Sequence, residues 1–136
     1  MPPTGTPGTP LGRKLGIREG DRVAVIDDPG HADTLLAPLP SGAAYRAEPD
    51  DADLVLCFVT TREALGRHVG ELGRAVFPDR ALWVAWPKRA SGVPTDVTED
   101  VVREVALPLG LVDTKVCVVD ETWSGLRLVW RRELRG

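Results

Sequence analysis

The sequence predicts an α/β fold, a three-layer sandwich in which helices cover both faces of a mostly parallel sheet. Apolar runs rich in β-branched residues alternate along the chain with segments whose apolar residues recur at helical spacing. That alternation is typical of parallel strands joined by helical crossovers. The last two apolar runs are separated only by a short link, residues 120–125, which predicts an antiparallel hairpin at the C-terminal end.

The first half of the chain contains a tail and the first part of the sheet. Four prolines and two glycines in residues 1–10 predict a flexible tail before a single domain over 11–136. Turn residues such as Asp28-Pro29-Gly30 interrupt the apolar runs and set their ends. The expected elements are a helix over 11–18, a strand over 22–27, a helix over 32–39, a weak strand over 43–48 and a strand over 53–59.

The second half contains two helices that begin with capping boxes. Thr60 with Glu63, and Asp96 with Glu99, have the spacing in which a side chain at the helix start and one three residues later satisfy free N–H groups. Gly110 follows the second helix where a left-handed glycine is expected. The apolar stripes of the helices are Leu65, Val69, Leu72 and Val76, then Val97, Val101, Val105 and Leu109. Strands are expected over 81–86, 112–119 and 126–132.

Composition excludes several classes of protein. The formal charge of −3 and the pI near 5.4 argue against a nucleic-acid partner or a membrane surface. The chain has no apolar run of the roughly 18 residues that a membrane span needs, and no signal peptide is recognisable, so a cytoplasmic protein is expected. Cys57 and Cys117 each lie inside an apolar run and are expected to be thiols.

Four stretches carry a resemblance to known proteins: 14–20, 82–88, 90–96 and 119–126. They resemble a bacterial family known only as a domain of unknown function, whose members are small and methyltransferase-like in fold. The resemblance and the strand–helix pattern together imply a Rossmann-like, S-adenosylmethionine-dependent methyltransferase fold, shortened by one strand–helix unit after the second strand. The six strands would then lie in the order 2-1-3-4-6-5, with the last strand antiparallel.

The loop after the first strand argues against S-adenosylmethionine as the cofactor. A cofactor-binding loop of this fold resembles Gly-x-Gly-x-Gly, because the backbone must pass close to the ligand. Residues 27–31 contain one glycine, Gly30, and a proline. An acidic residue at the end of the second strand normally holds the ribose, and Glu48, Asp50 or Asp51 could do so. The candidate cofactor contacts are therefore Asp27, Gly30 and Glu48.

Polar residues follow the predicted strands at the carboxyl edge of the sheet, where open parallel sheets bind ligands. The expected ligand contacts are His31, Lys88, Ser91, Glu121 and Trp123. Among them, Lys88 is the predicted anion contact, and Lys88 and Glu121 are the candidate proton carriers of an enzyme. Asp27, Asp28 and His31 have the chemistry of a metal corner, but turn and capping roles explain them, and no metal site is predicted.

Three functions remain open from the sequence. The leading one is a cytoplasmic ligand-binding or accessory protein on a methyltransferase-like scaffold, without conventional methyl transfer. The alternatives are a small enzyme acting on an anionic metabolite and a homodimeric interaction module. The module would associate through a smooth helix face formed by Gly66, Gly70 and Gly73. On the same helix, His68 lies between Leu65 and Leu72 and is expected to be partly covered.

Overall fold

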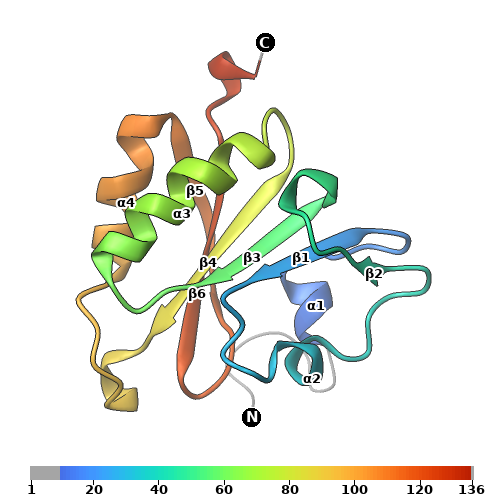
Figure 1. The fold of residues 1–136 in the computed structure, drawn as a ribbon, viewed down its shortest axis with the longest axis horizontal. Coiled ribbons are helices and arrows are strands. Elements are labelled where there is room, and N and C mark those ends of the chain that lie inside the picture. Colours follow the sequence, from blue (N-terminus) through green and yellow to red (C-terminus); the bar gives the residue numbers. More distant parts are fainter. Residues whose placement is uncertain (1–9, 136) are drawn as a thin grey trace.

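A computed structural model describes residues 10–135 and shows a six-stranded sheet between two pairs of helices (Figure 1). Most of the predicted flexible tail, residues 1–9, lies outside the described residues. The strands are β1 (Arg22–Ile26), β2 (Ala44–Tyr45), β3 (Leu54–Phe58), β4 (Ala81–Pro87), β5 (Leu111–Val118) and β6 (Trp123–Trp130). The helices are α1 (Leu11–Lys14), α2 (Ala32–Leu36), α3 (Arg62–Ala75) and α4 (Glu99–Ala106). Single 3-10 turns occupy Pro49–Asp51, Arg89–Ser91, Leu107–Leu109 and Arg132–Leu134.

The strand order is β2-β1-β3-β4-β6-β5, which confirms the predicted fold class and the predicted order. Strands β1 to β4 pair in parallel, and β6 pairs antiparallel with both β4 and β5. The hairpin link is shorter than expected, because β6 begins at Trp123 rather than at Leu126. Helices α1 and α2 and strand β2 are also shorter than expected. Helix α1 ends before Gly16, which has φ 95°, and α2 ends at Leu36 because Ala37, the residue before Pro38, is extended.

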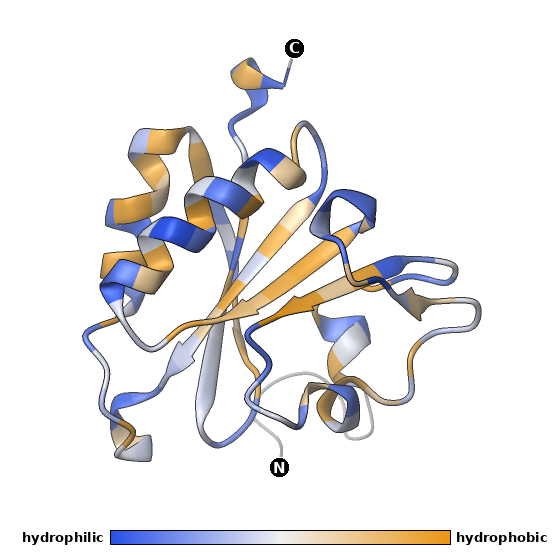
Figure 2. Cartoon of the chain, in the orientation of Figure 1, coloured by the Kyte–Doolittle hydropathy of each residue, from blue (hydrophilic) through white to orange (hydrophobic). Residues whose placement is uncertain are grey.

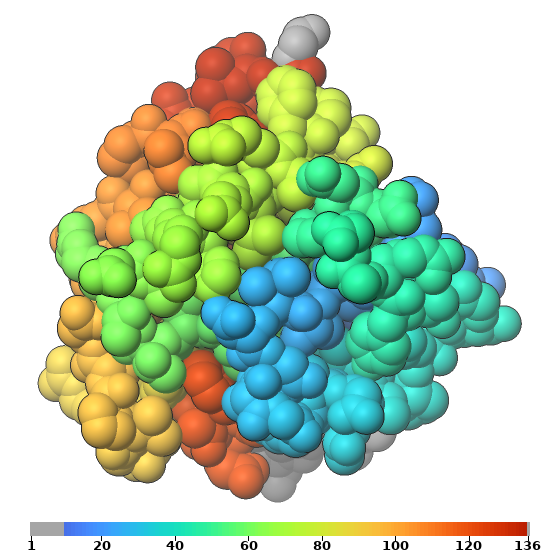
Figure 3. Space-filling model, viewed as in Figure 1, coloured from blue at the N-terminus to red at the C-terminus, as the bar shows by residue number. Residues whose placement is uncertain are grey.

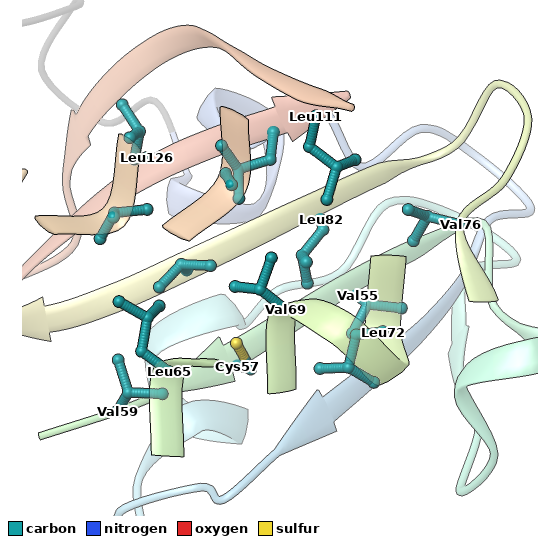
Figure 4. Packing of buried hydrophobic residues seen from close by; sticks show 14 of the residues in the cluster. Val55, Cys57, Val59, Leu65, Val69, Leu72, Val76, Leu82, Leu111 and Leu126 are labelled. Carbon is teal, nitrogen blue, oxygen red and sulfur yellow. The ribbon is translucent and has the colours of Figure 1, made fainter. Parts of the chain in front are cut away.

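The two faces of the sheet build two separate apolar cores. Alternate residues of the central strand β3 point to opposite faces, with Val55 and Cys57 toward α3 and α4 and Leu56 toward α1 and α2. Figure 4 shows the first core, and the orange of β3 in Figure 2 marks the central strand that both cores share. All residues of β3 and β4 are buried, as expected of a sheet covered on both sides.

The two cysteines are free thiols on strands that are not neighbours, β3 and β5. Cys57 is fully buried, and desolvation raises the pKa of its thiol to about 12. Among the described residues, no helix is both long and apolar enough to cross a bilayer.

Both predicted helix caps are wrong in position. The hydroxyl of Thr61, not Thr60, accepts the N–H of Ala64 at 3.1 Å, and that of Thr98, not Asp96, accepts the N–H of Val101 at 3.2 Å. The Asp96 carboxylate accepts the N–H of Arg62 at 2.7 Å, so it satisfies the start of α3 instead of α4. The left-handed glycine is confirmed: Gly110 has φ 100°.

The three glycines of α3 differ in their surroundings. A Cβ atom built on Gly73 would lie 3.0 Å from Leu111 Cδ1, so this glycine allows β5 to approach the helix closely. Gly66 and Gly70 have no atom within 4 Å of a built Cβ. No contact within the described residues therefore requires glycine at these two positions, and each glycine lowers the stability of the helix by about 1 kcal/mol relative to alanine.

Replacing Gly66 or Gly70 by alanine is expected to stabilise the protein. The free energy of unfolding should rise by about 1 kcal/mol for each variant, which is a gain of about 4 °C in the thermal midpoint. Gly73→Ala is the matched control, because its new methyl group would press on Leu111 and cancel the helical gain. If Gly66→Ala or Gly70→Ala lowers the midpoint and shifts the mass in solution, this face is a contact between copies of the chain.

Candidate functional site

The loop after β1 is held in a single shape by one of its own carboxylates. Asp28 Oδ1 accepts the backbone N–H groups of Gly30, His31 and Ala32 at 2.8, 3.1 and 3.1 Å. Burial opposes the charged form of Asp28, but these three donors outweigh it and hold the pKa of the carboxyl below its usual value. Asp28, rather than Asp27, thus satisfies the start of α2.

Asp27 begins the loop in the left-handed region, with φ 55°, a conformation that glycine adopts at no cost and aspartate tolerates. Its Oδ2 lies 2.6 Å from His68 Nε2. His68 comes from α3 and is buried, whereas the Asp27 side chain is 59% exposed. His68 was expected to be partly covered, and the structure shows it buried. Its carboxylate partner, Asp27, was not indicated by the spacing of the sequence.

A second histidine–aspartate pair joins the loop to the hairpin. His31 Nε2 lies 3.1 Å from Asp120 Oδ2, and the two side chains are 40% and 16% exposed. Asp120 Oδ1 also accepts the N–H groups of Thr122 and Trp123, both at 2.8 Å. Burial acts to raise the pKa of Asp120. The hydrogen bonds from the N–H of Trp123 and from the His31 ring act in the opposite direction and together outweigh burial, so the pKa is lowered. Figure 3 shows the hairpin lying against this loop at the lower edge of the molecule.

An acidic hollow of about 330 Å³ opens at the carboxyl ends of β1 and β2. Its lining is Val25, Asp28, Gly30, Ala32, Asp33 and Tyr45. Tyr45 is 41% exposed. Desolvation first, and then the carboxylates of Asp33 and Asp28, raise the pKa of its hydroxyl above the usual value, so the hydroxyl stays neutral well above pH 7. Glu48, the predicted ribose contact, is exposed ahead of the 3-10 turn and does not line this hollow.

A larger cleft of about 540 Å³ lies at the end of β4, on the α3 and α4 side of the sheet. Its lining includes the buried Trp86 and Val97, the exposed Val93 and Pro94, the cations Lys88 and Arg89, and Ser124. Lys88 is thus separated from the acidic hollow, although both openings are at the carboxyl edge.

The five predicted ligand contacts do not line one hollow. His31 is bonded to Asp120, and Lys88 lines the larger cleft. The Ser91 hydroxyl donates to the Lys88 carbonyl at 2.7 Å and closes the 3-10 turn. Glu121 is exposed at the hairpin turn. Trp123 is 8% exposed and packs edge-on against Phe58 at 5.0 Å between ring centroids, so it offers a ligand little surface.

The three residues of the suggested metal corner are each engaged elsewhere: Asp27 with His68, Asp28 with backbone N–H groups and His31 with Asp120. Within residues 10–135, no group of three or more histidine, cysteine, aspartate or glutamate side chains is placed to hold a metal ion.

Comparisons with known proteins match the fold but not the sequence. No protein-family model and no curated protein matches the chain, so the resemblance to an uncharacterised bacterial family stays a prediction. A methyltransferase from Aquifex aeolicus that depends on S-adenosylmethionine has a TM-score of 0.61 at 15% identity and covers 85% of each chain. Magnesium protoporphyrin IX methyltransferase from Synechocystis PCC 6803 with bound S-adenosylmethionine has a TM-score of 0.55 at 12% identity, over 89% of this chain and 74% of that one. A putative tRNA (m1A22) methyltransferase from Streptococcus pneumoniae in complex with S-adenosylmethionine scores 0.52 at 10% identity, over 88% and 70% of the two chains.

These matches establish a Rossmann-like methyltransferase fold and contradict one expectation from the sequence. The missing glycines of residues 27–31 argued against S-adenosylmethionine, yet solved structures of this fold are complexes with that molecule. The physical reason for the error lies in the loop: Asp27 and Gly30 both have positive φ, at 55° and 116°, so the left-handed turns that favour glycine are present with one glycine only.

Proposed function

We propose that this chain binds S-adenosylmethionine in the acidic hollow at the carboxyl ends of β1 and β2. The hollow lies at the carboxyl end of β1, which is one of the two strands, β1 and β3, between which the strand order reverses, and open sheets of this kind take ligands at the carboxyl ends of such strands. The observation that carries the proposal is the position and charge of this hollow in a fold whose solved structures include S-adenosylmethionine complexes.

The charge of the hollow suits the cofactor. S-adenosylmethionine carries a sulfonium and an ammonium group, and two carboxylates, Asp28 and Asp33, line the hollow. The lowered pKa of Asp28 keeps that carboxylate ionised at neutral pH. Tyr45 adds an aromatic face and a neutral hydroxyl. Carboxylates concentrate a cationic ligand and repel nucleotides with phosphate groups.

The loop itself fits a cationic ligand better than an anionic one. The N–H groups of Gly30, His31 and Ala32 already point to Asp28, so they do not receive the methionine carboxylate. The open side of Gly30, where a Cβ would meet no atom within 4 Å, allows the cofactor to approach the backbone. The residues that would hold the cofactor are therefore Asp28, Gly30, Asp33 and Tyr45.

Bound S-adenosylmethionine supplies an electrophilic methyl group. His31 is the candidate base that removes a proton from the methyl acceptor. It lies in the loop after β1 that also lines the hollow, it is partly exposed, and Asp120 orients its ring. Lys88 and Glu121, the proton carriers predicted from the sequence, lie on the segments after β4 and β5 and stay predictions. A methylation assay separates an enzyme from an accessory protein that binds without transfer.

Titration calorimetry with S-adenosylmethionine, S-adenosylhomocysteine and ATP tests the proposal. We expect both adenosyl ligands to bind with one site per chain and ATP not to bind. Tyr45→Ala should weaken binding about tenfold, a loss of about 1.4 kcal/mol, because an aromatic contact disappears, whereas Tyr45→Phe should stay close to the wild type. Asp33→Asn should weaken S-adenosylmethionine more than S-adenosylhomocysteine, since only the former carries a sulfonium charge.

Glu48→Gln is the matched control, because Glu48 is exposed outside the hollow. If Glu48→Gln weakens both adenosyl ligands while Tyr45→Ala does not, the cofactor lies where the sequence prediction placed it. The absence of heat with either adenosyl ligand at millimolar concentration would refute the proposal.

A further inference from the structure

We propose that the cleft at the end of β4 binds a small molecule with an apolar body and one anionic group, a carboxylate or a phosphate. We name this cleft the β4 cleft, and the residues that carry its chemistry are Lys88, Arg89, Val93, Pro94 and Ser124. The proposal does not depend on S-adenosylmethionine binding, because the two hollows share no lining residue.

The cations of the β4 cleft are available to a ligand. Neither Lys88 nor Arg89 forms an ion pair with any residue in 10–135. The carboxylate in the lining, Glu99, is bound by Arg103, and Arg103 also bridges to Asp113. Two adjacent cations without a carboxylate partner in the lining of a cleft suit the recognition of an anion.

The lining of the cleft includes exposed apolar side chains. Val93 is 38% exposed and Pro94 is also exposed, whereas Trp86 and Val97 are buried beneath the lining and belong to the core. Trp86 pairs with Ser124 across β4 and β6, which places a hydroxyl beside the indole. An inorganic anion alone would leave Val93 and Pro94 uncovered, so the fitting ligand has an apolar part that contacts them.

Backbone and side-chain hydrogen bonds fix the walls. The Lys88 N–H donates to the Thr122 carbonyl at 2.8 Å, which ties the cation-bearing segment to the hairpin. The Thr95 hydroxyl donates to the Thr60 carbonyl at 2.6 Å and accepts the N–H of Val97 at 3.0 Å, which ties the opposite wall to the start of α3. A site anchored on both sides loses little entropy when a ligand binds.

Calorimetry with four probes tests the β4 cleft: phenyl phosphate, benzoate, benzyl alcohol and inorganic phosphate. We expect at least one aromatic anion to bind at one site per chain. Benzyl alcohol, which lacks the charge, and inorganic phosphate, which lacks the apolar body, should bind at least about tenfold more weakly. The tighter of the two aromatic anions identifies the headgroup as phosphate or carboxylate.

Lys88→Met and Arg89→Gln should each weaken the aromatic anion about tenfold, because each removes a charge and keeps the side-chain stem. Arg67→Gln, an exposed cation on α3, is the control for loss of charge, and Tyr45→Ala is the control for the acidic hollow. Both controls should bind the aromatic anion like the wild type, and all variants should keep the wild-type thermal midpoint. The proposal fails if benzyl alcohol or inorganic phosphate binds as tightly as the tighter aromatic anion, or if both cleft variants keep the wild-type affinity. It also fails if neither aromatic anion binds at 5 mM, because a dissociation constant of that size corresponds to a binding free energy of only about 3 kcal/mol.

Discussion

Replacement of Trp83 by alanine is expected to lower the free energy of unfolding by about 3–5 kcal/mol. Trp83 is the largest fully buried side chain, with 0% exposure, and lies in the core between the sheet and α1 and α2. Its Nε1 donates to the Leu15 carbonyl at 2.7 Å, which fastens the end of the short helix α1 to the sheet. The variant removes the packing and leaves that buried carbonyl without its donor.

Urea unfolding followed by circular dichroism measures this loss. Trp83→Phe is the matched control, because it keeps an aromatic ring in the core and removes the hydrogen bond to Leu15. It should lose a smaller part of the stability, about 1–2 kcal/mol. A Cβ built on Gly125 would lie 3.2 Å from Trp83 Cε3, so the indole is closely packed there. If Trp83→Ala costs less than Trp83→Phe, the core on this side of the sheet repacks more easily than this close packing suggests.

The strand order follows from the sequence because it depends on robust features. Runs such as 53–59, apolar on both faces, require a sheet covered on both sides, and helices between the strands require parallel crossovers. The same argument does not locate helix starts. Thr60 and Thr61 are both possible caps of α3, and Asp96 and Thr98 are both possible caps of α4. Which residue caps each helix depends on tertiary contacts, such as the hydrogen bond from the Arg62 N–H to Asp96.

The site was predicted less well than the fold, because its contacts are long-range. His68 and Asp27 are 41 residues apart, and His31 and Asp120 are 89 residues apart. No local spacing indicates which residues of two loops face each other once the sheet has formed. The residues singled out from the sequence follow the carboxyl ends of the strands, but the sequence did not indicate on which face of the sheet each one lies. Trp123 points into one core, whereas Lys88 lines a cleft on the other side.

Asp120 is the residue whose loss should affect this edge most. Asp120→Ala removes the acceptor of two N–H groups in the hairpin turn and the partner of His31. We expect a loss of about 2–3 kcal/mol at pH 7, because unsatisfied backbone donors and a missing turn cap both weaken the hairpin. Asp120→Asn keeps an acceptor oxygen and should lose about half as much.

The dependence of this loss on pH identifies its origin. The pKa of Asp120 is lowered in the folded protein, so the unfolded chain binds the proton more tightly. The contribution of the carboxylate is therefore complete above about pH 5 and is lost as the pH falls through the unfolded value near 3.9 toward the lower, folded value. Unfolding of wild type and Asp120→Ala at pH 7, 5, 4 and 3 should show the gap between them narrowing only in the acid range. A gap that stays constant down to pH 3 would mean that the oxygen atoms stabilise the hairpin and the charge does not, in which case Asp120→Asn should match the wild type.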